Sequence, residues 1–325
     1  MKEYVISKND AGQRADKFLQ KAVKNLPASL LYKYLRLKRI KCNGKRCDRA
    51  QKLCEGDVLQ LYLNDEWFET VPTELAFLKA PPEVKIVYED ENLILLDKPV
   101  GLLVHEDEEE DEDTLIHRLL HYLYDHGAYD PKNEHSFVPA LCNRIDRNTS
   151  GIVIAAKNAE TLRIMNQKIK DRELKKLYLC AVFGTPEKKK DTLKAFLIKD
   201  EQENRVKIYS SPRPQAKTIL TAYETLYTNG RYSLLKVDLL TGRTHQIRAH
   251  MAYIGHPLVG DTKYGTQKEN RDLPLKFQAL CSYQLEFCFT TDAGILSYLN
   301  HRVFKVTPPE FVRQLFGERV YDRLD

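Results

Sequence analysis

Apolar positions near the amino terminus predict two short amphipathic helices followed by a small sheet. Between residues 14 and 26 the apolar side chains recur every three or four positions, as on a helix with one buried face. These side chains are Ala15, Phe18, Leu19, Ala22, Val23 and Leu26. A second helix is expected from Ser29 to about Lys38, and residues 40–45 and 58–63 read as strands, the first entering an Asn-Gly turn. This pattern predicts a compact unit over residues 1–63.

The regular apolar spacing stops after this unit and resumes near Val84. Residues 64–83 contain three prolines and no clear period, which predicts a linker. Trp67, the single tryptophan, is expected to pack between the two units beside this linker. A second domain is therefore expected over residues 84–325, because the whole chain exceeds the usual size of one domain.

Most of the second domain has the pattern of strands. Two short apolar runs joined by an acidic turn open it within residues 84–105. The other expected strands are 151–157, 175–184, 192–198, 205–209, 217–227, 232–240, 277–287 and 297–306. Helices are expected after the capping residues Thr114 and Asn158, and between Thr244 and Gly255. Consecutive strands with short turns predict an α+β fold, in which helices flank a mostly antiparallel mixed sheet.

The net charge of +5 is distributed unevenly along the chain. Residues 1–63 contain 15 Lys and Arg against 6 Asp and Glu, whereas residues 84–325 include an acidic run from Glu106 to Asp113. A basic segment of this kind favours a polyanion as partner. The acidic run is interpreted as a solvated loop, and its role is left open.

Cysteine usage and hydropathy indicate a reducing compartment. The seven cysteines form no C-x-x-C pair, and although Cys42, Cys47 and Cys54 could share a metal, their spacings match no ligand pattern. No apolar run approaches the roughly 18 residues that span a bilayer, and charges occupy the amino terminus where a signal peptide is apolar. We therefore expect a soluble, monomeric cytoplasmic protein with no membrane partner, metal or cofactor.

A polar turn before the apolar strand 151–157 is the first candidate for chemistry. Arg144 and Arg147 flank Asp146 there, and a nearby cation favours the ionised form of a carboxylate. Taken alone, such a turn is more often a structural ion pair than an active site.

A second cluster changes this interpretation. It consists of L-T-G-R-T-H-Q-I-R-A-H at 240–250 and G-H-P-L-V-G-D-T-K-Y-G at 255–265. Together with N-R-I-D-R-N-T-S-G at 143–151, it resembles the signature of the RluA-type RNA pseudouridine synthases. The opening strands and Lys175-Lys176-Leu177-Tyr178 are similar to further segments of that family. Residues 1–63 resemble the S-four-type (α-L) RNA-binding module, so the resemblance covers almost the whole chain.

The resemblance implies a role for several residues. Asp146 becomes the essential carboxylate that acts at the ribose of the target uridine, Tyr178 stacks on the base, and Arg248 pairs with Asp146. Arg144 would fill the gap left by the extruded base, although a phosphate contact or surface ion pair is the alternative. Further substrate contacts are expected from Arg147, Arg243 and His245.

The amino-terminal unit is expected to bind RNA phosphates through its basic side chains. These are Arg14, Lys17, Lys33, Arg36, Lys38, Arg39, Lys41 and Lys45. Family members with this module mostly act on large-subunit ribosomal RNA, which is therefore favoured over transfer RNA as the partner.

Two departures and two alternatives remain. Asn143 stands where the family usually has His, and Glu106 stands where Pro is usual. His245, His250 and His256 are close in sequence, but no carboxylate or cysteine accompanies them at metal-ligand spacing, so a structural or RNA-facing role is expected. A glycoside or nucleoside hydrolase would need a second carboxylate, which is not evident. A non-catalytic RNA-binding protein would leave the family register of Asp146, Tyr178 and Arg248 unexplained.

Overall fold

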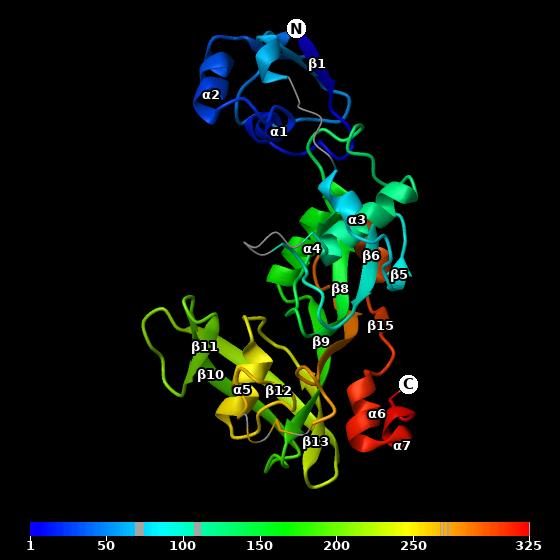
Figure 1. Cartoon of the computed structure of the whole chain (residues 1–325). Helices are drawn as coiled ribbons and strands as arrows, with labels where there is room; N and C mark the ends of the chain where they lie inside the picture. The colour runs from blue at the N-terminus through cyan, green and yellow to red at the C-terminus, as the bar shows by residue number, and fades with distance from the viewer. Residues whose placement is uncertain (69–74, 107–111, 267, 269, 272, 325) are drawn as a thin grey trace.

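A computed structural model of the chain describes residues 1–68, 75–106, 112–266, 268, 270–271 and 273–324. The amino-terminal unit lies at one end of an elongated molecule, and the large sheet with its helices occupies the rest (Figure 1). The carboxyl terminus lies beside the large sheet, far from the amino terminus (Figure 1). Among the described residues, no helix combines the length and apolarity that crossing a membrane requires.

The amino-terminal unit is a four-stranded sheet with two helices. Its strand order is β1-β4-β2-β3. The bounds are β1 Lys2–Val5, α1 Ala15–Ala22, α2 Ala28–Arg36, β2 Ile40–Cys42, β3 Lys45–Arg46 and β4 Val58–Leu61. The predicted apolar stripe is buried, since Phe18 and Leu19 pack with Ile40 and Leu59 in one cluster. The first helix ends at Ala22, earlier than expected. Pro27 lies a few residues further on, immediately before the second helix, and the residue before a proline disfavours helical backbone.

The segment expected to be a linker has structured parts. It contains the 3-10 helices η1 Asp65–Trp67 and η2 Ala76–Lys79. Phe77 is buried with Tyr124 and Tyr129 against the second domain, so the carboxyl-terminal part of the segment belongs to that packing. Trp67 packs against the hydrophobic cluster of the amino-terminal unit, and the prediction that it lies between the units was wrong.

The two units meet at residues 134–136 and at the start of α4 Ala159–Lys170, where Asn9 Oδ1 accepts from the Ala159 amide and Arg163 donates to the Ala11 carbonyl. Ser136 Oγ donates to Asp10 Oδ1 at 2.5 Å, and Asn9 Nδ2 donates to Glu134 Oε1 at 2.8 Å. The His135 ring packs edge-on against Tyr4, 5.1 Å between centroids. At this contact, hydrogen bonds therefore flank the His135 ring, which packs into the amino-terminal unit.

The described part of the second domain forms an 11-stranded sheet. Its path is β11-β10-β12-β13-β9-β14-β8-β6-β5, with β15 paired to β14 and β7 paired to β8. The strands are β5 Ile86–Glu89, β6 Leu93–Lys98, β7 Ala140–Leu141, β8 Ser150–Ala156, β9 Leu174–Phe183, β10 Lys190–Asp200, β11 Arg205–Tyr209, β12 Lys217–Thr228, β13 Tyr232–Asp238, β14 Leu280–Phe287 and β15 Val303–Lys305. Their pairing is antiparallel except between β8 and β14. The predicted α+β class is confirmed.

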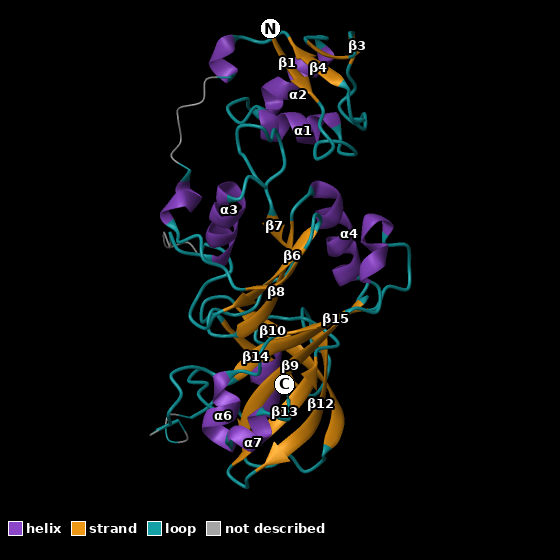
Figure 2. Cartoon of the chain, turned by 90° about the vertical axis from the view of Figure 1, so that its right-hand side faces the viewer, coloured by secondary structure: helices purple, strands orange, loops and turns teal. Residues whose placement is uncertain are grey.

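Helices cover both faces of this sheet (Figure 2). They are α3 Leu115–Asp125, α4 Ala159–Lys170, α5 Gln246–Tyr253, the 3-10 helix η3 Gly294–Leu299, α6 Glu310–Phe316 and α7 Glu318–Tyr321. Alternation along β9 divides the core, because Tyr178 and Cys180 pack toward α5 whereas Leu179 and Ala181 join the cluster that contains α6.

The predicted helix caps are confirmed. Thr114 Oγ1 accepts a hydrogen bond from the His117 amide, and Asn158 Oδ1 accepts one from the Thr161 amide. The strand expected over residues 297–306 was wrong for its first half. Leu296 and Leu299 are three positions apart and bury one face of η3, so only β15 remains a strand.

Candidate active site

Asp146 lies in the turn that leads into β8, and backbone contacts fix this turn. The Cys142 amide donates to the Ile154 carbonyl at 2.7 Å, and the Thr149 amide donates to the Asp146 carbonyl at 3.0 Å. Asn143 Oδ1 accepts from the Ile154 amide at 2.8 Å, which gives this departure from the family pattern a structural role. The Asp146 side chain remains 27% exposed. It is therefore held firmly and still accessible from solvent.

Gly151 allows the strand after this turn to approach β14 closely. Its φ is +106°, and an added Cβ would overlap the Ser282 carbonyl. Gly151 pairs with Ser282, and Ser150 pairs with Cys281, at the parallel junction of β8 and β14. The turn that carries Asp146 thus ends at the point where the two halves of the sheet join.

Arg248 on α5 holds the Asp146 carboxylate. Its Nη1 is 2.9 Å from Asp146 Oδ2, across 102 positions in sequence. The rest of the guanidinium binds Asp261, with Nε to Oδ2 at 2.7 Å and Nη2 to Oδ1 at 3.0 Å. One buried guanidinium therefore bridges two carboxylates, in a geometry that suits its planar set of donors.

Electrostatics keep this cluster charged. Burial opposes the charged form of Arg248, but the hydrogen bonds and charges of Asp261 and Asp146 raise the pKa of its guanidinium. Burial would raise the pKa of Asp261, yet Arg248 and the amides of Lys263 and Tyr264 lower it below the usual value. Asp261 thus stays an anion at a fully buried position.

Tyr178 on β9 is also part of the site. The residue is buried and lies opposite Ser282 in the β9–β14 register. Burial raises the pKa of its phenol to about 12; the Asp146 charge adds to the rise, and a hydrogen bond with Ser282 opposes it. Tyr178 therefore contributes a neutral aromatic ring beside Asp146.

His245 completes the group of predicted residues that the fold brings together. It precedes α5 with a left-handed backbone, φ 50°, and its Nε2 lies 3.8 Å from Asp146 Oδ2. Burial lowers the pKa of its imidazole to about 4, although the Asp146 charge acts in the opposite direction. The ring is therefore neutral at physiological pH.

The other predicted substrate contacts lie at the exposed rim. Arg144 and Arg243 are exposed, and burial together with the Arg144 charge lowers the pKa of nearby His105. Arg147 is also exposed, but its Nε donates to the Gly101 carbonyl at 3.0 Å. These arginines lie near the site without joining the Asp146–Arg248 pair.

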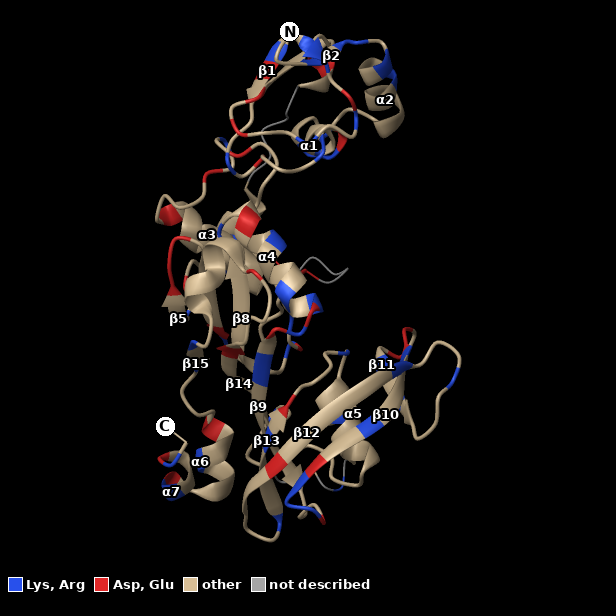
Figure 3. Cartoon of the chain, turned by 180° about the vertical axis from the view of Figure 1, so that it is seen from behind, with Lys and Arg blue, Asp and Glu red and all other residues tan. Residues whose placement is uncertain are grey.

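The eight predicted RNA-binding residues all lie on the separate amino-terminal unit. Seven are exposed and Lys41 is half-buried. Figure 3 shows Lys and Arg around α2 and β2 of this unit. Arg14 is paired with Asp16 at 2.6 Å, and Arg39 and Lys41 lie over the rings of Tyr34 and Tyr62.

Sequence reasoning missed three residues around the site: Asp261, Tyr264 and Lys98. The first two lie in the G-D-T-K-Y-G stretch, which was noted only as a motif. Lys98 lies in K-P-V-G, which was interpreted as a turn. Both stretches contain glycines that mark them as turns in the sequence, and this was the signal that could have drawn attention to them. It does not indicate which partner each side chain binds.

Lys98 fixes the Asp146 turn from behind. It is 0% exposed, and its Nζ donates to the carbonyls of Pro99, Leu102 and Arg147 at 2.9, 2.8 and 2.8 Å. Burial lowers the pKa of its ammonium to about 7, while the Asp146 charge opposes this shift. Three carbonyl acceptors match the three donors of an ammonium group, so these contacts favour the charged form.

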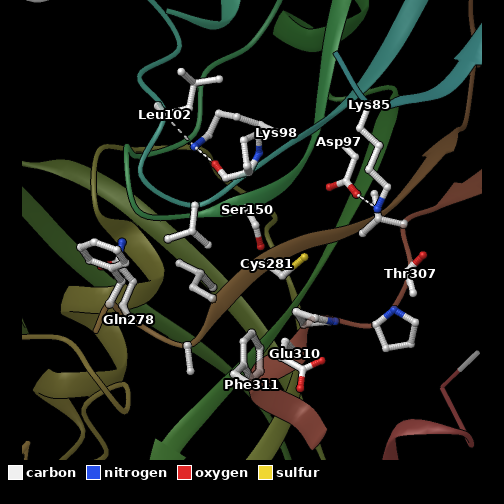
Figure 4. A pocket seen from close by; sticks show the side chains of 18 of the residues that line it. Lys85, Asp97, Lys98, Leu102, Ser150, Gln278, Cys281, Thr307, Glu310 and Phe311 are labelled. Carbon is white, nitrogen blue, oxygen red and sulfur yellow. Dashed lines mark hydrogen bonds and ion pairs between the residues drawn. The ribbon is translucent and has the colours of Figure 1, made fainter. Parts of the chain in front are cut away.

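A hollow of about 930 Å³ lies next to this lysine. Figure 4 shows Lys98, Ser150, Gln278, Cys281 and Phe311 of α6 among the side chains that line it. Asp146 does not line it. The hollow therefore adjoins the catalytic candidates through Lys98 and Ser150 but is separate from them.

The remaining histidines of the second motif have structural partners. His250 Nδ1 lies 2.9 Å from Thr221 Oγ1, and His256 Nδ1 lies 2.9 Å from the Phe183 carbonyl. Within the described part of the chain, no three His, Cys, Asp or Glu side chains are grouped so as to hold a metal ion. The acidic run lies partly outside the described residues, at 107–111. Its ends pair with His117, Lys79 and Arg118.

Comparisons with known proteins identify the family of the chain. Residues 92–253 match the family model described as RNA pseudouridylate synthase. The "Uncharacterized RNA pseudouridine synthase MG370 homolog" of Mycoplasma pneumoniae is 34% identical over 88% of this chain and 88% of its own length. The "Ribosomal large subunit pseudouridine synthase C" of Vibrio cholerae is 32% identical over 81% of this chain and 80% of its own.

Solved structures show the same fold. The structure of "Human RNA Pseudouridylate Synthase Domain Containing 4" superposes with a TM-score of 0.57 at 20% identity, over 72% of this chain and 93% of that chain. The sequence relatives and the geometry agree with the resemblance seen in the motifs. The chain therefore belongs to the RluA-type family of RNA pseudouridine synthases, enzymes that isomerise uridine within RNA.

Proposed function

We propose that Asp146 is the catalytic carboxylate of this synthase. In the isomerisation, the bond between ribose C1′ and uracil N1 breaks, the base turns, and a new bond joins C1′ to C5. The proton on C5 leaves, and N1 ends protonated, so product and substrate have the same atoms. Asp146 acts at the ribose, either by attacking it or by removing a proton, while the glycosidic bond breaks.

The Asp146–Arg248 contact is the observation that carries this proposal. A carboxylate in a partly desolvated site protonates unless a fixed cation stabilises its charge. Arg248 Nη1 supplies that cation at 2.9 Å, and Asp261 holds the guanidinium in place. The exposed share of the Asp146 side chain leaves a path for an extruded nucleotide.

The surrounding residues receive roles that follow from their positions. The buried ring of Tyr178 stacks on the target base, and exposed Arg144 takes the space that the base leaves in the RNA. Arg147 and Arg243 bind neighbouring phosphates at the rim, and His245 contacts the target nucleotide. None of these roles needs a cofactor.

The substrate we propose is large-subunit ribosomal RNA. Relatives from Vibrio cholerae and Borreliella burgdorferi carry the names ribosomal large subunit pseudouridine synthase C and D. We also propose that residues 1–63 form an S-four-type RNA-binding domain, joined by residues 64–83 to a catalytic domain over 84–325. The enzyme acts as a monomer in the cytoplasm, and its amino-terminal domain supplies affinity for RNA phosphates.

Mapping of pseudouridine by carbodiimide-stop sequencing tests the catalytic assignment. Ribosomal RNA from cells lacking the protein is compared after complementation with wild type, Asp146→Asn or Asp200→Asn. Asp200 is a matched aspartate at the end of β10, where it accepts from Lys207 and from the Glu203 amide and has no contact with the Asp146–Arg248 pair. We expect wild type and Asp200→Asn to restore the missing stops and Asp146→Asn to restore none.

Two outcomes would contradict the assignment. Restoration of the stops by Asp146→Asn would remove Asp146 from the chemistry. Release of free uracil without pseudouridine, from purified wild-type enzyme and RNA, would instead indicate a nucleoside hydrolase.

A further inference from the structure

Tyr264 joins three parts of the active-site region. Its hydroxyl lies 2.9 Å from His245 Nδ1 and 3.0 Å from the Val206 amide of β11. Its own amide donates to Asp261 Oδ1 at 3.1 Å. Its ring lies 5.3 Å from the Arg248 guanidinium carbon and 5.6 Å from that of Arg205. The side chain therefore contacts His245 while its backbone supports the partner of Arg248.

The direction of the hydrogen bonds follows from counting donors. The Val206 amide can only donate, so the Tyr264 oxygen accepts that bond. If His245 Nδ1 also carried a hydrogen, it would donate to the same oxygen and leave the phenol hydrogen without this acceptor. If Nδ1 is unprotonated, the phenol hydrogen points to it and every group in the chain of contacts is used.

The same tautomer suits the other side of the imidazole ring. His245 Nε2 lies 3.8 Å from Asp146 Oδ2. With the hydrogen on Nε2, the ring presents a donor to the carboxylate, whereas the other tautomer would direct a lone pair at it. Both faces of His245 therefore favour one arrangement of its single hydrogen.

We propose that Tyr264 is a positioning residue, whose hydroxyl holds His245 as the tautomer that carries hydrogen on Nε2. This inference rests on the proposed function of Asp146. A separation of 3.8 Å exceeds hydrogen-bond distance, so the Nε2 hydrogen remains available for an oxygen of the nucleotide that enters beside Asp146. Tyr264 thus prepares His245 to orient the target nucleotide before the substrate arrives.

The left-handed backbone of His245 supports this arrangement. Its φ of 50° fixes the residue at the start of α5, where the Ala249 amide donates to its carbonyl at 2.9 Å. Burial also keeps the imidazole neutral, and a tautomer is defined only for the neutral ring. The backbone and the burial of His245 therefore fix its place and its neutral charge, and Tyr264 determines which ring nitrogen carries the hydrogen.

Tyr264→Phe isolates the hydroxyl, because it keeps the ring near both guanidinium groups and the backbone bond to Asp261. Tyr223→Phe is the matched control. Tyr223 is a buried tyrosine of the same domain, and its hydroxyl donates to the Lys188 carbonyl at 3.2 Å and not to a residue of the site. Tyr264→Phe removes the contacts of the hydroxyl with His245 and with the Val206 amide, whereas Tyr223→Phe removes one contact and does not affect His245.

The direct measurement is a long-range ¹H–¹⁵N correlation spectrum of the full chain with labelled histidine. His245 signals are assigned by their loss in His245→Gln. In wild type we expect Nδ1 to show the shift of an unprotonated ring nitrogen and Nε2 that of a protonated one. Protonated Nδ1 in wild type would overturn the proposal, and this reading needs no folded Tyr264 variant.

The functional measurement is the single-turnover rate of pseudouridine formation at saturating RNA. We expect Tyr264→Phe to mix the two tautomers and to slow the reaction about tenfold, with Tyr223→Phe near wild type. An unchanged tautomer and rate in Tyr264→Phe would overturn the proposal. Asp146→Asn separates the two claims, because its activity and its spectrum are measured independently. Activity in that variant refutes the role of Asp146, whatever tautomer of His245 its spectrum shows.

Discussion

Arg248 links Asp261 to Asp146, and the first prediction concerns this link. The substitution Asp261→Asn removes one charge and leaves the size of the side chain nearly unchanged. Asp261 Oδ1 accepts from Arg248 Nη2 and from two amides, so the asparagine oxygen must occupy that position. The asparagine NH₂ then replaces Oδ2 and meets the Arg248 Nε hydrogen, where the carboxylate oxygen lay 2.7 Å from Nε. Two donors face each other, and the main buried ion pair is lost.

The expected loss of stability follows from burial. Removing one partner of a buried ion pair costs about 3–5 kcal/mol. Arg248 is 9% exposed and keeps Asp146 as a partner at 2.9 Å, so the loss should fall near the lower end, about 3 kcal/mol. Because Arg248 is then held from one side only, the reaction rate at saturating RNA should fall about tenfold or more.

Urea unfolding with two probes measures this loss. Far-UV circular dichroism follows mainly the large domain, whereas Trp67 fluorescence follows the amino-terminal unit against which Trp67 packs. We expect Asp261→Asn to shift the first transition to lower urea and to leave the second in place. Asp97→Asn is the control, because the Asp97–Lys85 pair has an exposed lysine and contributes at most about 1 kcal/mol.

Equal stability of Asp261→Asn and Asp97→Asn would refute the reasoning. So would a destabilised Asp261→Asn with the full wild-type rate, because Arg248 would then hold Asp146 without help. A shift of the Trp67 transition alone would also refute it, because the loss of stability would then lie in the amino-terminal unit and not in the large domain.

Two further predictions concern other parts of the molecule. Lys98→Met should lower the free energy of unfolding by about 2 kcal/mol or more, because the carbonyls of Pro99 and Leu102 lose this donor at about 1–3 kcal/mol each, whereas the Arg147 carbonyl still accepts from the Gly101 amide. Lys85→Met, which changes an exposed lysine, should cost less than about 1 kcal/mol, and equal urea midpoints would contradict the role of Lys98. Deletion of residues 1–63 should weaken RNA binding and flatten its dependence on salt in a filter-binding titration, while saturating RNA still gives pseudouridine. Complete loss of turnover in the deleted but folded protein would show that the amino-terminal unit takes part in the chemistry.

Local sequence patterns were sufficient for most of the fold. The apolar spacing in α1 and the capping residues Thr114 and Asn158 act over one or two helical turns, so they can be recognised in the sequence. Residues 297–306 were misassigned because a short 3-10 helix and a strand have similar apolar content. Trp67 was misplaced because a sequence does not show which of two adjacent cores a side chain joins.

The candidate site was predictable only in part, for a related reason. The resemblance indicated Asp146 with Arg248, and the structure brings them to 2.9 Å. It did not indicate Asp261, because a bridging guanidinium has no periodic signal in the sequence. Lys98 was interpreted as part of a turn, since burial of a lysine is unexpected unless its carbonyl partners are known.

Charge in the site also gives a reason to expect RNA-binding basic side chains in two places. Asp146 and Asp261 share one guanidinium, and His245 is neutral, so this group carries a net negative charge that repels an RNA phosphate. The exposed arginines at 144, 147 and 243, which neighbour Asp146 and His245 in sequence, are expected to offset that repulsion locally. The amino-terminal unit contacts the catalytic domain at residues 134–136 and at Ala159 and Arg163 of α4, not at the Asp146–Arg248 pair, and screening in solution acts within about 10 Å. Binding to the protein that lacks residues 1–63 should therefore still weaken as salt increases, and the remaining slope measures the contribution of the catalytic rim alone.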